Sequence, residues 1–168
     1  MTSFSIRRAR TSDVPAIQKL VEPLVNRRIL LGKDLVVFYE AVQEFRVAET
    51  HDGRLIGCGA LHVMWQDLAE IRTLAADRTR RGTGVGHALL DALLDRARQI
   101  GLRRVFCLTF EVAFFESHGF HVIEGTPVTP DVYLELLRSH DDGVAEFLDL
   151  ARVKPNTLGN TRMLIELA

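Results

Sequence analysis

A basic, glycine-rich stretch holds the residues whose types and spacing are best suited to chemistry. Residues 81–87 read Arg-Gly-Thr-Gly-Val-Gly-His, after an apolar strand-like run and before an amphipathic helix-like run. A strand, a short turn and a helix in this order direct backbone N–H groups and the positive helix end at one point, which suits a diphosphate. The glycines let an anion approach the main chain closely, and Arg80 and Arg81 add positive charge. The stretch therefore predicts a phosphate-binding turn.

The spacing of the glycines distinguishes this turn from two other phosphate-binding loops. A Walker-type P-loop ends in Gly-Lys-Ser/Thr, whereas this stretch ends in Gly86-His87 without a lysine. A G-x-G-x-x-G pattern also fails, because its last position falls on His87 or Leu89. Arg81, Gly84 and Gly86 fit R-x-x-G-x-G instead. With this pattern the chain resembles the GNAT superfamily of acetyl-CoA-dependent N-acetyltransferases, in which this turn wraps the coenzyme A diphosphate. Taken alone, the pattern also fits an ordinary strand-to-helix turn with a solvated arginine.

The hydrophobic pattern supplies the elements that must hold this turn. Apolar residues alternate in some segments and recur at helical spacing in others. Asp52-Gly53 marks a hairpin, and Gly101 is a natural end for the long helix. Expected strands cover residues 4–10, 45–49, 55–63, 69–76, 104–109, 120–124 and 163–167. A first helix is expected after a cap at Thr11 or Ser12, with Ile17, Leu20, Val21 and Leu24 on its apolar face. Further helices are expected over 34–43, 86–100 and 113–118. One or two more are expected in 126–153, broken at Asp141-Asp142-Gly143. This order predicts an α/β (α+β) fold with a mixed central sheet flanked by helices.

Size and composition restrict the class of protein. The chain has 168 residues, 47% apolar and 26% charged, which fits one globular domain over residues 1–168. A net charge of −1 argues against a nucleic-acid or membrane partner. No apolar run approaches the roughly 20 residues of a membrane span. Cys58 and Cys107 lie in apolar runs, which indicates reduced, buried thiols and a cytoplasmic protein.

Motifs from about residue 30 to the end strengthen the resemblance. They are Val47-Ala48-Glu49, Asp52-Gly53, Ile56-Gly57-Cys58-Gly59-Ala60-Leu61, Glu70-Ile71, Val105-Phe106-Cys107-Leu108-Thr109 and Phe114-Phe115-x-x-His118-Gly119-Phe120. Together they are similar to the acetyltransferase domain of N-acetylglutamate synthases. The short length, without an amino-acid-kinase-like domain, resembles the stand-alone actinobacterial form. The resemblance implies the GNAT fold, with a sheet splayed between its fourth and fifth strands.

The resemblance also implies where acetyl-CoA lies. In GNAT proteins the main chain of residues 74–76 pairs with the pantetheine arm like an added strand. Core packing explains Ala75 and Ala76 equally well. The implied coenzyme contacts are Leu74, Ala75, Ala76, Arg81, Gly82, Thr83, Gly84, Val85, Gly86 and His87.

Glu70 is the candidate general base. Acetyl transfer needs a deprotonated amine, and amines have pKa values on the order of 8 or above, so a base assists. Glu70 lies 11 residues before Arg81, a spacing found in some GNAT enzymes, and shares a strand face with Arg72 and Leu74. A simple ion pair between Glu70 and Arg72 or another cation explains the residue equally well.

Basic residues are the candidates for binding the carboxylates of an amino-acid acceptor. They are Lys33, Arg72 and Arg162, of which Arg72 and Arg162 form the preferred pair. Each also fits a solvated surface role. Thr109, at the end of its strand, either contacts the acceptor or caps the strand.

Other chemistries find less support in the sequence. Cys58 and His62 share a strand face, but no matching second pair follows, so we expect no metal. The apolar run around Cys107 argues against an acyl-carrying thiol. Many superfamily members place a tyrosine before Gly-Phe to protonate the leaving thiolate. Phe114-Phe115-Glu116 stands there instead, so water protonates the thiolate or it leaves as such.

The resemblance implies an enzyme that moves acetyl from acetyl-CoA to the α-amino group of L-glutamate or L-glutamine, at the first step of arginine biosynthesis. Two alternatives stay open, a GNAT enzyme with another amine acceptor and a non-catalytic acyl-CoA sensor. A homodimer is compatible with the sequence.

Overall fold

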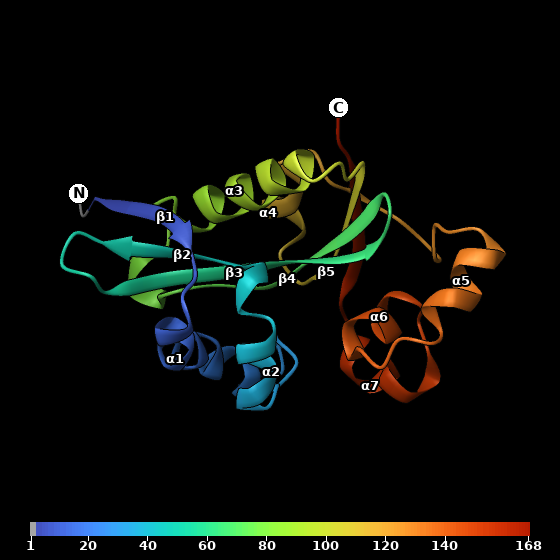
Figure 1. Ribbon diagram of the computed structural model, residues 1–168, viewed down its shortest axis with the longest axis horizontal. Helices are drawn as coiled ribbons and strands as arrows, with labels where there is room; N and C mark the ends of the chain where they lie inside the picture. The colour runs from blue at the N-terminus through green and yellow to red at the C-terminus, as the bar shows by residue number, and fades with distance from the viewer. Residues whose placement is uncertain (1–2) are drawn as a thin grey trace. The chain divides into compact units, whose positions relative to one another are not determined.

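The computed structural model describes residues 3–168, whose strands form a seven-stranded sheet in the order β1-β2-β3-β4-β5-β7-β6 (Figure 1). Strands β4 and β5 are parallel, whereas β1–β2, β2–β3, β5–β7 and β6–β7 are antiparallel, so the predicted mixed sheet is confirmed. The strands are β1 Phe4–Arg8, β2 Phe45–Thr50, β3 Leu55–Trp65, β4 Leu68–Ala76, β5 Arg104–Thr109, β6 His121–Val122 and β7 Thr161–Glu166. The helices are α1 Val14–Asn26, α2 Leu35–Glu40, α3 Val85–Gln99, α4 Val112–Glu116, α5 Pro130–Leu136, α6 Asp142–Phe147 and α7 Lys154–Thr157.

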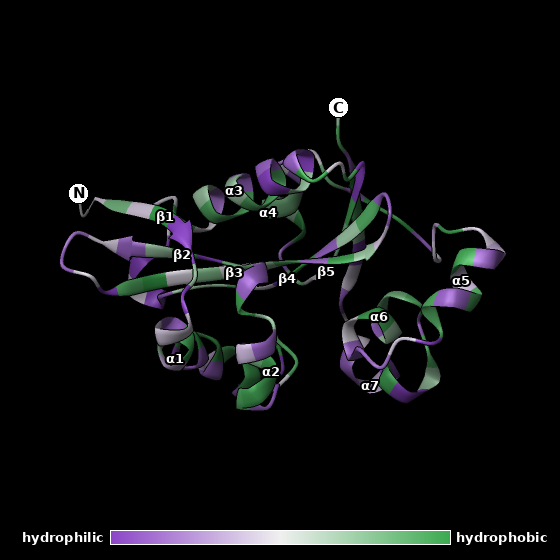
Figure 2. Cartoon of the chain, viewed as in Figure 1, coloured by the Kyte–Doolittle hydropathy of each residue, from purple (hydrophilic) through white to green (hydrophobic). Residues whose placement is uncertain are grey.

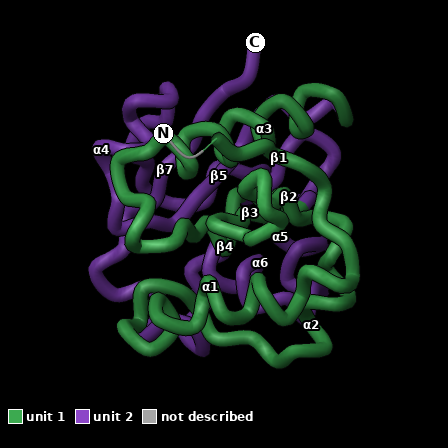
Figure 3. The backbone as a smooth tube through the Cα atoms, turned by 90° about the vertical axis from the view of Figure 1, so that its left-hand side faces the viewer, with its two compact units in different colours: residues 1–62, 71–100 green, residues 63–70, 101–168 purple. Residues whose placement is uncertain are grey.

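The chain divides into two compact units, coloured separately in Figure 3. The first unit comprises residues 1–62 and 71–100, and the second comprises residues 63–70 and 101–168. Strand β4 contributes residues to both. The assignment of the whole chain to a single domain stays a prediction. Among the described residues, no helix is both long and apolar enough to cross a bilayer.

One face of β2 and β3 in the first unit packs against α1 and α2. Val14, Ile17 and Val21 of α1 and Phe38 of α2 are almost completely buried, and they contact Phe45 and its neighbours in the sheet. The predicted apolar face of α1 is therefore confirmed. Its predicted cap at Thr11 or Ser12 is wrong, because Thr11–Asp13 form a short 3-10 turn and Asp13 holds the N-cap position of α1. The Asp13 side chain makes no capping bond to α1 and instead accepts the N–H of Arg10 at 2.7 Å.

The other face of these strands packs against α3 at a notch made by two glycines. A Cβ on Gly57 would lie 2.7 Å from Val85 and 2.8 Å from Leu89, and a Cβ on Gly59 would lie 2.9 Å from Leu93. These distances are shorter than van der Waals contact permits. Gly57 and Gly59 thus allow α3 to approach the sheet closely.

Gly57→Ala is expected to lower the free energy of unfolding by about 2 kcal/mol, because the added methyl group overpacks this notch. Leu89→Ala removes the Leu89 methyl group that the new Cβ at residue 57 would contact, and this substitution is itself destabilising. The double variant should therefore lose about 1 kcal/mol less than the sum of the single losses. Urea unfolding of the four proteins measures this cycle, and strictly additive losses would contradict the close approach.

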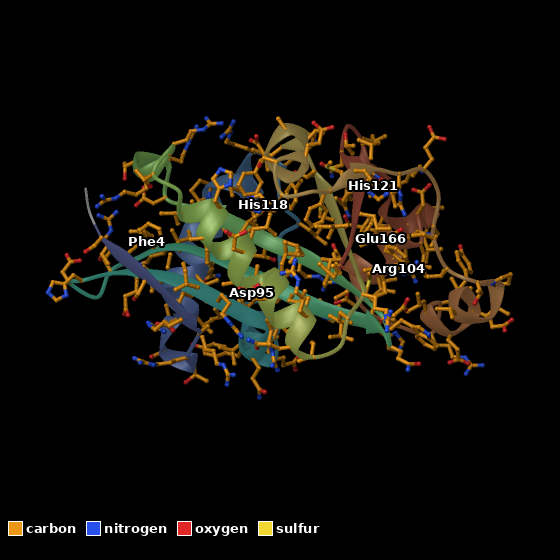
Figure 4. All side chains as sticks on the ribbon, turned by 90° about the horizontal axis from the view of Figure 1, so that it is seen from above. Phe4, Asp95, Arg104, His118, His121 and Glu166 are labelled. Carbon is orange, nitrogen blue, oxygen red and sulfur yellow. The ribbon has the colours of Figure 1, made fainter. Side chains whose placement is uncertain are left out.

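A separate core holds the second unit together. Phe106 of β5 and Phe147 of α6 are fully buried and meet edge to face, with ring centroids 5.0 Å apart. Arg104 lies opposite Glu166 in the β5–β7 register, and both are labelled in Figure 4. Arg104 also contacts the Asp67 carboxylate at 3.1 Å and the Pro127 carbonyl at 2.5 Å.

The segment 126–153 contains two α-helices, α5 and α6, as predicted, but the break between them lies at residues 137–141. Asp141-Asp142-Gly143 was expected to break a helix, but Asp141 accepts the N–H of Val144 at 2.9 Å and α6 begins at Asp142. The stretch is thus a helix start, because an aspartate at the N-cap satisfies an amide that the helix leaves open. Strand β6 covers two residues instead of the five expected over residues 120–124, and α2 ends at Glu40 instead of Gln43.

Candidate active site

Side chains of the turn itself fix the path from β4 to α3. The Asp77 carboxylate accepts the N–H of Thr79 at 2.9 Å and a guanidinium N–H of Arg54 at 2.6 Å. Thr83 donates its N–H, at 3.2 Å, and its hydroxyl, at 2.5 Å, to the carbonyl oxygen of Arg80. These hydrogen bonds stabilise the loop before α3.

The glycines of the turn have the backbone conformation that the sequence pattern requires. Gly82 and Gly84 have φ of +79° and +84°, in the left-handed region that favours glycine. A Cβ on either would meet no atom within 4 Å, so the space beside both residues is open. A ligand can approach the main chain there.

The start of α3 presents amide donors to this space. The first bond of the helix runs from the N–H of Ala88 to the carbonyl of Gly84, at 3.0 Å, so Val85 and Gly86 have N–H groups without an acceptor in the helix. No side chain caps the helix at Gly84. An anion such as a diphosphate would satisfy these donors and the positive helix end together, so the turn fits coenzyme A.

Strand β4 contains a feature that the sequence gives no means to predict. Thr73 has φ of +56°, a rare conformation for a β-branched residue. Its hydroxyl accepts a hydrogen bond from Lys33 Nζ at 3.3 Å, and its carbonyl oxygen lies 3.5 Å from Cys58 Sγ. Strained residues of this kind concentrate at functional sites. Thr73 is thus a site candidate that sequence reasoning missed.

The three residues after Thr73 also pack inside the first unit. Ala75 is buried against the cluster that includes Val14 and Phe45, and Leu74 and Ala76 contact the cluster beneath α3. The core-packing role considered for Ala75 and Ala76 is therefore confirmed. A role in binding the coenzyme arm through main-chain groups is compatible with it.

Glu70 is a buried carboxylate of β4, with 6% of its surface exposed. It belongs to the second unit, where its charge adds to burial in raising the pKa of the Cys107 thiol. Burial alone raises the pKa of the Cys58 thiol to about 12. Both thiols are therefore poor nucleophiles, as expected. No group of three or more potential metal ligands occurs in residues 3–168.

Arg162 of β7 is anchored to main-chain carbonyls. Its Nε and Nη2 donate to the carbonyl of Gly125 at 3.1 and 3.0 Å, Nη1 donates to Glu146 at 3.1 Å, and Nη2 donates to Phe147 at 2.5 Å. Its guanidinium also lies 5.0 Å from the centre of the Phe106 ring. Four of its five N–H groups are thus engaged, which favours a structural role over the carboxylate binding expected for it.

The remaining acceptor candidates lie on separate elements. Lys33 precedes α2 and reaches Thr73 of β4, and Arg72 of β4 is half-buried. The Thr109 hydroxyl accepts the N–H of Glu111 at 2.8 Å, which is the strand-capping role considered for it. Two surface hollows of the second unit, around Leu136 and Arg152 and around Trp65 and Pro127, contain none of the predicted site residues.

The mixed sheet and the open turn before α3 are those of an acetyltransferase. The family model described as "Acetyltransferase (GNAT) family" matches residues 22–120. The chain therefore belongs to the GNAT acetyltransferase family.

Particular relatives share more than the fold. An amino-acid acetyltransferase of Mycobacterium tuberculosis is 62% identical over 164 residues, which cover 96% of this chain and 94% of the relative. A crystal structure of a protein from the same organism, in complex with CoA and NLQ, superposes with a TM-score of 0.95 at 61% identity, covering 98% of this chain and 99% of that one. N-acetylglutamate synthase from Neisseria gonorrhoeae, complexed with coenzyme A and N-acetyl-glutamate, has a TM-score of 0.78 at 27% identity. This chain is covered completely and spans 36% of that longer protein.

Proposed function

We propose that this protein is an amino-acid N-acetyltransferase that moves acetyl from acetyl-CoA to the α-amino group of L-glutamate or L-glutamine. The observation that carries the proposal is the 62% identity, over nearly the whole chain, to an amino-acid acetyltransferase. The N-acetyl-glutamate complex of the Neisseria relative supports an acidic amino acid as acceptor. The product would enter arginine biosynthesis. In this proposal the enzyme is a single cytoplasmic domain over residues 1–168, uses no metal, and is a monomer or a homodimer.

The turn before α3 binds the coenzyme in this proposal. The amides of Val85 and Gly86 donate to the diphosphate, and Gly82 and Gly84 leave room for it. Arg81 supplies charge, while Thr83 keeps the loop in place and His87 extends the amide row. The main chain of Leu74, Ala75 and Ala76 pairs with the pantetheine arm, because the left-handed conformation of Thr73 interrupts the regular strand just before it.

Glu70 accepts a proton from the acceptor amine, directly or through one water. The freed amine forms a bond to the acetyl carbon, its nitrogen releases a second proton to water, the carbon–sulfur bond breaks, and coenzyme A leaves as a thiolate. Phe114 and Phe115 carry no hydroxyl, so water protonates that thiolate.

Lys33 and Arg72 are the proposed carboxylate ligands of the acceptor. Lys33 Nζ is already oriented by the Thr73 hydroxyl, and Arg72 lies two residues from Glu70 on β4. Thr109 is an additional contact of the acceptor. Arg162 supports the second unit from inside, since its guanidinium is bound to carbonyl oxygens.

A panel of free amino acids, assayed with acetyl-CoA by release of thiol, tests the proposed function. We expect turnover with glutamate, glutamine or both to exceed turnover with lysine, alanine and polyamines by at least about tenfold. Turnover confined to a polyamine or a peptide amine would identify a different acceptor class. Coenzyme binding with no turnover for any amine would indicate a sensor.

Arg81→Gln is expected to weaken coenzyme A binding about tenfold, because a charge-assisted contact to a phosphate contributes on the order of 1.5 kcal/mol. Isothermal titration calorimetry measures this change. Arg98→Gln, on the exposed side of α3 in an ion pair with Asp95, is the matched control and should bind normally. Equal affinities for both variants would exclude Arg81 from the coenzyme site.

A further inference from the structure

Two arginines of the first unit lie opposite each other on the edge strand β1 and its neighbour β2. Arg8 of β1 pairs in register with Arg46 of β2. Directly opposite side chains in an antiparallel pair are about 5 Å apart at Cβ, where like charges are destabilising. Phe4 and Ile6 contact the cluster beneath α3, and Arg8 follows them at the same two-residue period. Arg46 shares this side with Ala48, so both guanidinium groups belong to the α3 face of the sheet.

Arg96 of α3 brings a third positive charge to the same place. Helix α3 packs on β1 and β2, and both Arg8 and Arg96 act with burial to lower the pKa of Arg46. No carboxylate is among the groups that shift this pKa. In Figure 2 the C-terminal half of α3 is coloured as hydrophilic, and Figure 4 labels Asp95 there, over the strands.

Neighbouring arginines of the first unit have acidic partners. Arg7 forms ion pairs with Asp13 and Glu49, both at 2.8 Å, and Arg98 pairs with Asp95 at 3.1 Å. The hydrogen bond recorded for Arg46 is instead a long one, from Nη1 to its neighbouring carbonyl at 3.4 Å. Half-burial of a charge without a compensating partner is unfavourable. A bound anion would remove both the repulsion and the desolvation cost.

We propose that Arg8, Arg46 and Arg96 form a binding site for a small oxyanion, separate from the coenzyme turn. Guanidinium groups bind phosphate-like and carboxylate oxygens in a bidentate manner, and a dianionic phosphate best neutralises three of them. Arg96 lies 12 residues after Gly84, so the helix separates the two sites by about 18 Å. The anion would tie the edge strand β1 to β2 and α3.

Calorimetric titration of inorganic phosphate tests this site. The protein is saturated with coenzyme A to occupy the turn, and chloride keeps the ionic strength constant. We expect saturable phosphate binding that Arg46→Gln and Arg96→Gln each weaken at least about tenfold, while Arg98→Gln leaves it unchanged. Acetate in place of phosphate distinguishes a carboxylate ligand from a phosphate one. The absence of saturable binding, or equal binding by Arg96→Gln and the parent protein, would overturn the proposal.

Thermal unfolding gives a second readout that does not depend on the baseline stability of a variant. Phosphate should raise Tm more than an equal ionic strength of chloride does, and this excess should vanish in Arg46→Gln and Arg96→Gln. Phosphate also stabilises proteins by exclusion from their surface, so an excess that persists in both variants would contradict the site. Neither substitution should change coenzyme affinity, so failure of the oxyanion site and failure of the proposed acetyltransferase function are separately visible.

Discussion

Glu70→Gln should lower kcat for acetylation of the preferred amino acid by about 10²- to 10³-fold at neutral pH, with coenzyme A affinity nearly unchanged. The substitution keeps the shape of a buried side chain and removes its ability to accept a proton, and general-base catalysis contributes an effect of this size. Steady-state kinetics and calorimetry measure the two quantities. The deficit should shrink as the pH rises above the pKa of the substrate amine, because a deprotonated amine no longer needs a base.

Glu124→Gln is a matched control, because the same chemical change occurs at an exposed residue. It should leave kcat within a factor of about two. If Glu70→Gln retains kcat while it destabilises the fold, Glu70 is only an ion-pair partner, which is the alternative that the sequence left open. A deficit that is the same at every pH would likewise argue against a proton-accepting role.

Arg162→Gln should lower the free energy of unfolding by about 3 kcal/mol. The guanidinium donates to the carbonyls of Gly125, Glu146 and Phe147, of which Phe147 is buried and Glu146 is half-buried. A buried acceptor that loses its donor costs about 1–3 kcal/mol. Chemical denaturation measures the loss. The free energy of unfolding of Arg162→Lys should lie between those of the parent protein and Arg162→Gln, because an ammonium group keeps the charge but cannot reproduce the planar set of guanidinium donors.

The control for this prediction is Arg152→Gln. Arg152 pairs with Asp142 at 2.5 Å, but about half of each side chain is exposed, so the loss should stay below about 1 kcal/mol. A stable Arg162→Gln variant with a strongly raised KM for the amino acid would reverse our interpretation. Arg162 would then bind the acceptor carboxylate, as the sequence indicated.

Regular patterns account for the parts of the fold that could be predicted. Strand β5 has the predicted bounds, because its apolar run is flanked by polar residues. Helix α3 begins and ends within one residue of its prediction, since Gly84 and Gly101 mark both ends with left-handed conformations. The turn could be predicted because its chemistry depends on backbone groups, which glycine spacing reveals directly.

Features that depend on distant partners could not be predicted. The left-handed conformation of Thr73 contradicts the local preference of a β-branched residue, so no sequence pattern predicts it. The three carbonyls that accept hydrogen bonds from Arg162 come from segments that are remote in sequence, so these bonds could not be predicted, and a role of Arg162 in acceptor binding stays a prediction. The break between α5 and α6 was predicted, but its position was not, because Asp141 ends the break by capping α6.

The glycine notch of β3 has a consequence for evolution of the coenzyme turn. Val85 is both the first residue of α3 and one of the side chains in contact range of Gly57. The position of the first amides of α3 therefore depends on how closely the helix packs against the interior of the sheet. Under the proposed function, sequence drift at these interior positions is therefore constrained by coenzyme affinity as well as by thermostability.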